Sequence, residues 1–155
     1  MEYLAVKWLH ILSSTFLFGT GIGSAFYMLF TSVSRDVRAI AVVSRYVVLA
    51  DWIFTSSTIV LQPLTGFYLI HLAGFPLQSA WIMWSIGLYF FAGACWLPVV
   101  WIQYQMHRLA EAAASAGEPL PPAYHRLYRW WFGLGWPAFA AVIGIYGLML
   151  AKPTF

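Results

Sequence analysis

The chain has 155 residues, of which 62% are apolar and 8% are charged. A soluble domain carries roughly 25% charged residues, so this composition excludes an ordinary soluble domain and indicates an integral membrane protein. The net charge of +3 comes from a few arginines near predicted helix ends, which bears on membrane topology and gives no reason to expect nucleic-acid binding. The single cysteine excludes an internal disulfide and any site built from several cysteines.

Four apolar runs are long enough to cross a lipid bilayer, since a spanning helix needs about 20 residues. They cover about residues 4–30, 46–72, 81–104 and 130–151. We therefore predict an all-α fold, a four-helix transmembrane bundle, that forms one domain over residues 1–155 and contacts the lipid bilayer.

The first run carries polar residues on one helical face. Lys7, His10 and Ser14 are three and four residues apart, so a helix places them on the same side. Gly19 and Gly23 add a G-x-x-x-G spacing, which lets another helix or a flat ligand approach closely. An ionisable side chain inside a span is costly, about 2.5–3.5 kcal/mol on insertion scales. His10 is therefore either a ligand or a hydrogen-bonded packing residue.

The second run has a polar seam whose members alternate four and three residues apart: Asp51, Thr55, Thr58, Gln62 and Thr65. Such a seam faces other helices and not lipid. It serves either interhelical hydrogen bonding or a polar pocket or proton path that starts at Asp51. An ion pair between Asp51 and Arg45 is a third interpretation. Pro63 lies beside the seam and predicts a kink.

Three further histidines have different surroundings. His71 closes the second run on the same side of the membrane as His10, which makes it a candidate second metal ligand beside His10. On an ideal helix it points nearly opposite to the polar seam, so only the Pro63 kink or a second chain would turn it inward; the alternative is an interfacial residue. His107 and His125 flank a connection beside arginines, and we predict that they face water or lipid headgroups.

The basic residues predict the orientation. Six arginines lie in or beside the first and third connections, whereas the opposite side has only Lys7 and Lys152. Arginine-bearing connections stay in the cytoplasm. We therefore predict both termini on the outer, periplasmic side of a bacterial inner membrane. The segment SAGEPLPP in the third connection is predicted to end its helix.

The chain lacks the motifs of hydrolytic catalysis, namely a nucleophile elbow and an H-E-x-x-H pair, and it also lacks a P-loop. Haem fits better, because its iron accepts a neutral histidine nitrogen and a helical bundle suits a flat macrocycle. We expect a haem with His10 and His71 as its metal ligands. Lys7, Ser14 and Gln62 are the other expected contacts of this cofactor, with Lys7 balancing a propionate.

The segments VKWLHILSSTFLFGTGIGSAFYM and VVLADWIFTSSTIVLQPLTGFYL resemble a widespread bacterial family of small four-helix membrane proteins of unknown function. The K-x-x-H opening with the aromatic–glycine step, at Lys7, His10, Phe18 and Gly19, is similar to the first helix of bacterial membrane protoporphyrinogen oxidases of the HemJ type. The second resemblance implies a compact bundle that holds b-type haem through a first-helix histidine. It makes the chain a candidate haem-dependent oxidoreductase.

Three functions thus stay open. The first is a haem protein with a redox or porphyrin-related role near the outer leaflet, whose small-molecule partner is a porphyrin or a quinone. The second is a small transporter or channel-like component that uses the polar seam from Asp51 to Thr65. The third is a non-catalytic assembly subunit, in which the glycines and the seam serve packing alone. A homodimer is compatible with all three.

Overall fold

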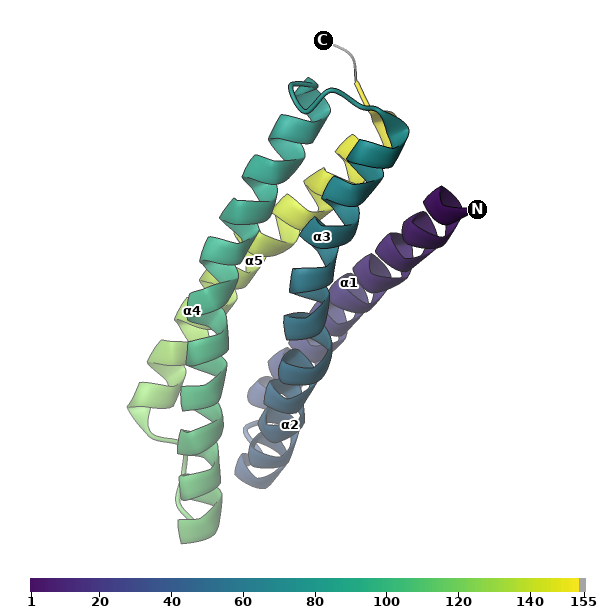
Figure 1. Ribbon diagram of the computed structural model, residues 1–155. Coiled ribbons are helices and arrows are strands. Elements are labelled where there is room, and N and C mark those ends of the chain that lie inside the picture. The colour runs from purple at the N-terminus through teal and green to yellow at the C-terminus, as the bar shows by residue number, and fades with distance from the viewer. Residues whose placement is uncertain (154–155) are drawn as a thin grey trace.

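The computed structural model describes residues 1–153, and every regular element in that range is helical (Figure 1). The all-α prediction is therefore confirmed for the described residues. The elements are α1 (Glu2–Ser34), α2 (Val37–Ala50), the π-helix η1 (Asp51–Thr55), α3 (Ser56–Ala73), α4 (Ala80–Ala116) and α5 (Pro122–Ala151).

Three of these helices, α1, α4 and α5, are long and apolar enough to cross a membrane. The predicted runs 4–30, 81–104 and 130–151 lie inside them, and α4 continues twelve residues past its run to Ala116. The predicted run 46–72 falls on α2, η1 and α3. These elements follow one another without a break and with helical backbone angles at each junction, but they are not one regular α-helix. The helix also continues through Pro63, and the irregularity lies earlier, at Asp51–Thr55.

Local sequence explains where the helices begin and end. Asp36 caps α2, because its carboxylate accepts hydrogen bonds from the backbone N–H groups of Arg38 and Ala39 at 3.0 and 3.1 Å. Gly74 and Gly117 end α3 and α4 with a φ of 68°, a left-handed conformation that glycine adopts at little cost. The prolines that follow Gly117 then keep the chain extended until α5 begins, as predicted for SAGEPLPP.

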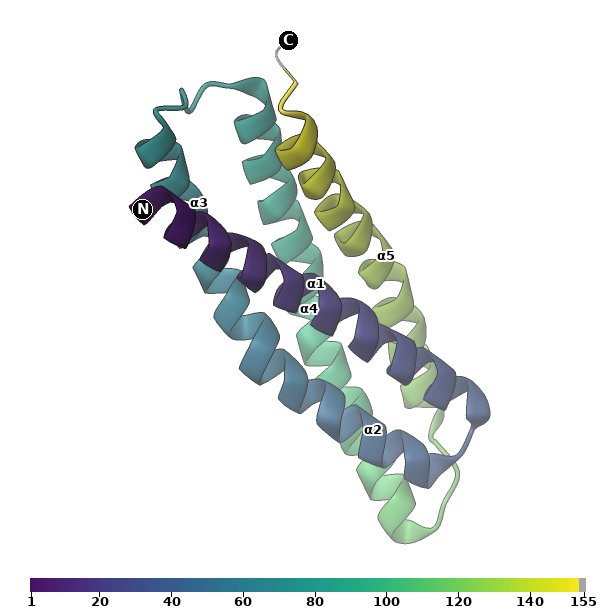
Figure 2. The ribbon, with the colours of Figure 1, turned by 90° about the vertical axis from the view of Figure 1, so that its right-hand side faces the viewer.

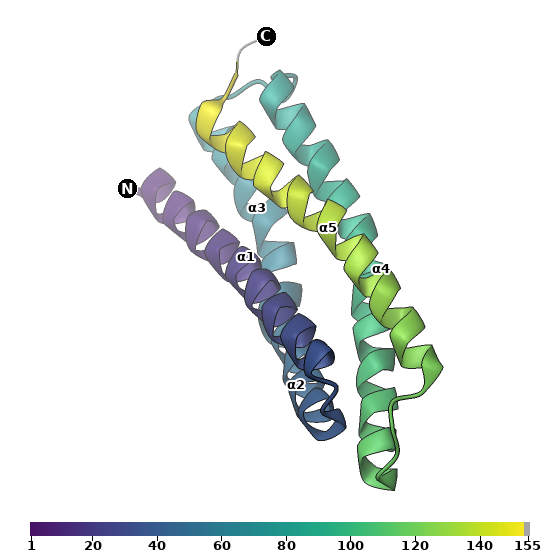
Figure 3. The same cartoon turned by 180° about the vertical axis from the view of Figure 1, so that it is seen from behind.

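The helices form two pairs. Helix α4 packs along α5 (Figure 3), and α1 packs against α2, η1 and α3. The two pairs meet mainly through α2 and α4. The start of α1 and the end of α5 lie at one end of the molecule, together with the connection 74–79, and the connections 35–36 and 117–121 lie at the other end (Figure 2). Lys152, at the end of α5, contacts the connection 74–79, since its Nζ lies 5.0 Å from the ring centroid of Phe75.

The apolar core occupies the end of the bundle that carries the arginines. Its buried members come from α1, α2, α4 and α5, and they include Met28, Ile40, Val47, Ile102, Met106, Tyr124 and Trp131. Toward the termini the buried side chains of α1 and α3 are polar, namely Ser13, Thr58 and Thr65.

The exterior is apolar over most of its area. Only 6% of the most apolar stretch of α1, and the same share of α5, is buried within the chain. Large side chains such as Trp8, Phe26, Trp101 and Trp136 are exposed. Such a surface is far larger than the apolar patches that water-soluble monomers expose, so the helices contact lipid.

Candidate functional site

His10 and Thr65 join α1 to α3. The Nδ1 atom of His10 lies 2.7 Å from Oγ1 of Thr65, which in turn lies 2.6 Å from the carbonyl oxygen of Leu61. The hydroxyl has a single proton, and threonine in a helix commonly donates it to the carbonyl four residues earlier. The imidazole Nδ1–H then donates to Thr65, and Nε2 keeps a free lone pair. This tautomer follows from the hydrogen-bond network.

Gln62 and Ser13 hold the backbone of His10 in place. The Gln62 amide donates to the carbonyl oxygen of His10 at 2.9 Å and also to the Ser13 hydroxyl, and Ser13 donates to the same carbonyl at 3.1 Å. Gly66 lets α3 approach, because a Cβ at this position would lie 3.4 Å from Cε1 of His10. Sequence reasoning did not single out Ser13, although its position three residues after His10 is a usable signal.

Lys7 and Ser14 do not bond to the α3 residues that surround His10. Lys7 is exposed, and its Nζ lies 5.8 Å from the ring centroid of Tyr3. The Ser14 hydroxyl donates to the carbonyl oxygen of Ile11 at 2.7 Å, and the Ser14 carbonyl accepts from the hydroxyl of Tyr146 in α5. Of the two serines, Ser13 therefore shares the α3-facing side with His10.

His71 lies in the last turn of α3 and is exposed. Gly66 faces His10, and five further residues turn the helix by about 140° and advance it by about 7.5 Å. Within one chain His71 therefore points away from His10. In residues 1–153 no three His, Cys, Asp or Glu side chains gather into a group that could hold a metal ion.

An open groove of about 310 Å³ lies between α1 and η1. Its walls are Thr15, Phe16, Gly19, Thr20 and Phe54, and the rings of Phe16 and Phe54 stack with their centroids 5.9 Å apart. His10 does not line it.

The polar seam of the second run faces the inside of the chain, as its spacing predicted. Asp51, Thr55, Thr58 and Thr65 are buried, and Gln62 is half-buried. The hydroxyl of Thr55 donates to the Asp51 carboxylate at 2.8 Å. Thr58, like Thr65, donates to a carbonyl of its own helix.

Asp51 begins the π-helix, where the backbone N–H of Ser56 donates to the Asp51 carbonyl five residues earlier. Such segments are rare and frequently mark functional sites. From α4, the side chain of Gln103 reaches the Asp51 carboxylate. Gln103 is 4% exposed, and its Oε1 has no hydrogen-bond partner in the described part of the chain. Arg45 is exposed and forms no ion pair with Asp51, so that interpretation was wrong.

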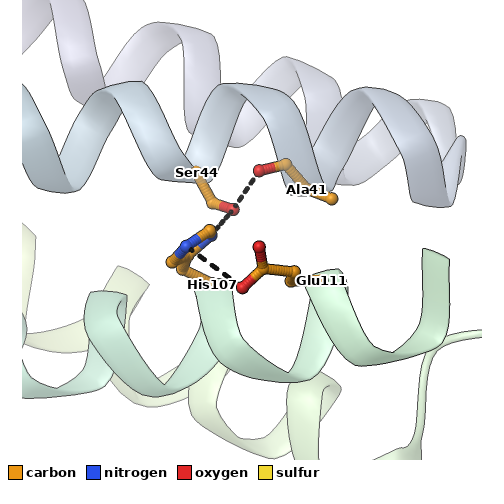
Figure 4. Close-up of polar contacts among 4 residues, drawn as sticks. All are labelled: Ala41, Ser44, His107 and Glu111. Atoms are coloured by element: carbon orange, nitrogen blue, oxygen red, sulfur yellow. Dashed lines mark hydrogen bonds and ion pairs between the residues drawn. The ribbon is translucent and has the colours of Figure 1, made fainter. Parts of the chain in front are cut away.

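His107 also differs from its prediction, because its ring lies between α4 and α2, which cover most of it (Figure 4). Its side chain is 15% exposed, its Nδ1 lies 3.2 Å from the Ser44 hydroxyl, and its Nε2 lies 3.7 Å from Oε2 of Glu111. The sequence carried a signal for this, since Gln103, His107 and Glu111 are spaced four residues apart on one helix face. His125 is exposed, as predicted.

A model of the family described as "Predicted integral membrane protein (DUF2269)" matches residues 4–153. The chain belongs to this family. The predicted membership in a membrane protein family of unknown function is thereby confirmed. No curated protein and no solved structure matches the chain, so the resemblance to HemJ-type oxidases gains no support from these comparisons. This family member is an integral membrane protein with at least three helices suited to a bilayer.

Proposed function

We propose that this family member binds a b-type haem through Nε2 of His10. The observation that supports the proposal is the 2.7 Å contact between His10 Nδ1 and Thr65 Oγ1. A metal-bound histidine almost always donates its other ring N–H to a fixed acceptor, which sets the tautomer and the ring orientation. Thr65 is such an acceptor, and haem iron accepts the neutral nitrogen that remains.

The residues around His10 would let its imidazole hold the iron of a haem. Gln62 and Ser13 fix the backbone at His10, and Gly66 places no side chain against the imidazole. Lys7, one turn nearer the N-terminus, is an exposed cation that can balance a propionate. His71 faces away from His10 on its own chain, so it reaches the same iron only from a second copy in a homodimer. When bound, haem supplies one-electron redox chemistry, and a porphyrin or a quinone is then the small-molecule partner.

The proposal includes a topology of four spans in a bacterial inner membrane. The continuous helix from Val37 to Ala73 is long enough to cross, since its predicted part alone, residues 46–72, extends about 40 Å against a hydrocarbon core of about 30 Å. All six arginines belong to the end of the bundle opposite the termini, and they are exposed. The positive-inside rule then puts that end in the cytoplasm and His10 near the periplasmic side.

The test is the absorption spectrum of the detergent-purified protein, as isolated and after reduction with dithionite. We expect a Soret band that shifts on reduction, with sharpened visible bands. Protein that is isolated without colour is to be mixed with haemin and measured again. A chain that is colourless and takes up no haemin contradicts the proposal.

A further inference from the structure

Asp51 is isolated from other charges. No other Asp, Glu, Lys or Arg lies between Tyr46 and Met106, α1 carries none between Lys7 and Arg35, and residues 130–151 carry none. The carboxylate is 5% exposed and accepts a hydrogen bond from the neutral Thr55 hydroxyl, and the neutral side chain of Gln103 lies beside it. A buried charge without a counter-ion is costly, so Asp51 is suited to gain and lose a proton.

Gln103 extends the surroundings of Asp51 toward the arginine-bearing end. Its unpartnered Oε1 is an acceptor in a buried position, where such atoms are rare and call for an explanation. His107 follows one turn later on the same face of α4, about 6 Å along the helix. Gln103 thus lies between the buried carboxylate and an imidazole.

His107 in turn faces a side chain that is open to water. Ser44 donates its one proton to the carbonyl oxygen of Ala41 at 3.1 Å, so it accepts from Nδ1–H of His107 (Figure 4). The lone pair of Nε2 is then directed to the side of Glu111, whose side chain is 64% exposed. His107 is therefore positioned to take a proton from water beside Glu111.

We propose that Asp51 is a proton-binding site that exchanges with water at the arginine-bearing end of the bundle through Gln103 and His107. A hydronium ion gives its proton to Nε2 of His107, where an N–H bond forms. A water molecule that donates to the free Oε1 of Gln103 would carry the proton onward: an N–H bond of the imidazolium breaks, an O–H bond forms on the Asp51 carboxylate, and His107 returns to its neutral form. The site needs no haem and stands apart from His10.

The remaining titratable groups at this end do not compete for this position. Arg38, Arg45 and Arg108 are exposed, as is Tyr27 on α1. On α5, Tyr124 is bonded to Ser32 and Tyr128 stacks on Trp131. Toward the termini the path ends at Thr55, because Thr58 and Thr65 donate to their own helix. Asp51 therefore exchanges its proton only with the arginine-bearing end of the bundle.

The experiment is time-resolved infrared spectroscopy of the full chain in lipid vesicles after a pH jump. Wild-type protein is expected to show a carboxylic acid C=O band that changes with pH and is missing in Asp51→Asn. His107→Gln is expected to slow that change by at least about a hundredfold, the low end of what a positioned proton-transferring side chain contributes. Gln103→Leu should slow it as well. Glu118→Gln, in the exposed connection after α4, is the control and should match wild type.

Circular dichroism checks that each variant folds. If His107→Gln does not fold, Ser44→Ala replaces it, because this variant removes the hydrogen-bond partner of His107 Nδ1 and should also slow the change. A pH jump that changes no band dependent on Asp51 overturns the proposal. If the Asp51 band changes at the wild-type rate in the folded His107→Gln and Gln103→Leu proteins, the proposed proton path through these two residues is overturned. Neither outcome depends on whether haem is bound.

Discussion

His10 and Thr65 are 55 positions apart in the chain and 2.7 Å apart in space, between Nδ1 of the imidazole and the threonine hydroxyl. This contact fixes the rotation of α1 against α3 at the level where Gly66 allows the two helices to approach. It also decides which imidazole nitrogen stays free. The packing of two helices and the chemistry available at His10 therefore depend on the same hydroxyl.

Removing that hydroxyl should affect both properties. Thr65→Val keeps the shape of the side chain but leaves Nδ1 of His10 without its partner. We expect a loss of about 1 kcal/mol in the free energy of unfolding, together with a broadened haem spectrum, because the ring is no longer held. Denaturant titration in detergent and absorption spectra measure the two effects. Thr15→Val is the control, since Thr15 bonds only to the carbonyl of Ile11; equal effects of the two substitutions would contradict this account.

The size of residue 66 should limit the α1–α3 contact. A Cβ at Gly66 would lie 3.4 Å from Cε1 of His10, so Gly66→Ala brings ordinary contact and should be tolerated. Gly66→Leu forces larger atoms toward the ring, and overpacking of this kind costs about 1–3 kcal/mol. Thermal unfolding in detergent compares it with Gly23→Leu, where nothing lies within 4 Å of an added Cβ. A Gly66→Leu protein as stable as Gly23→Leu would show that the helices do not meet here.

At the other end of the bundle, Ser32 and Tyr124 join α1 to α5. Their hydroxyl oxygens lie 2.8 Å apart, and Tyr124 is 1% exposed. Tyr124→Phe should lower the free energy of unfolding by about 1 kcal/mol, because the half-buried Ser32 hydroxyl loses a partner. Tyr128→Phe, which removes a hydroxyl without a hydrogen bond to the described residues, should cost less. A larger loss in Tyr128→Phe would speak against the bond.

The fold was predictable where it depends on composition and local rules. Apolar length located α1, α4 and α5, and the glycine and prolines after Ala116 predicted the end of α4. The three-four spacing from Asp51 to Thr65 predicted a buried seam. The π-helix was not predictable, because its hydrogen-bond register depends on how the second helix packs on its neighbours and not on any one residue.

The candidate site was predictable only in part, because side-chain partners depend on helix rotation. The spacing of His10 and Ser14 suggested a shared face, yet it is Ser13 that meets Gln62. His107 was assigned to water because arginine follows it, whereas the tilt of α2 against α4 covers its ring with Ser44. A sequence shows which residues share a face of one helix, but not which neighbouring helix covers that face.

Four spans should be detectable by cysteine labelling. In a Cys95→Ser background, Ser34→Cys and Gln78→Cys lie in or beside the connections at either end of the helix from Val37 to Ala73. A maleimide that does not cross membranes should label Gln78→Cys in intact spheroplasts, and Ser34→Cys only after the membrane is permeabilised. Labelling of both from the same side would mean that this helix does not cross.

Haem binding at His10 is tested most directly by titrating haemin into the purified wild-type protein, His10→Ala and His125→Ala. Both variants lose one imidazole, but His125 is exposed at the opposite end of the bundle. We expect a saturable Soret band of the same intensity in wild type and His125→Ala, and its loss in His10→Ala. A full, unshifted band in folded His10→Ala protein would contradict the assignment of His10 as the haem ligand.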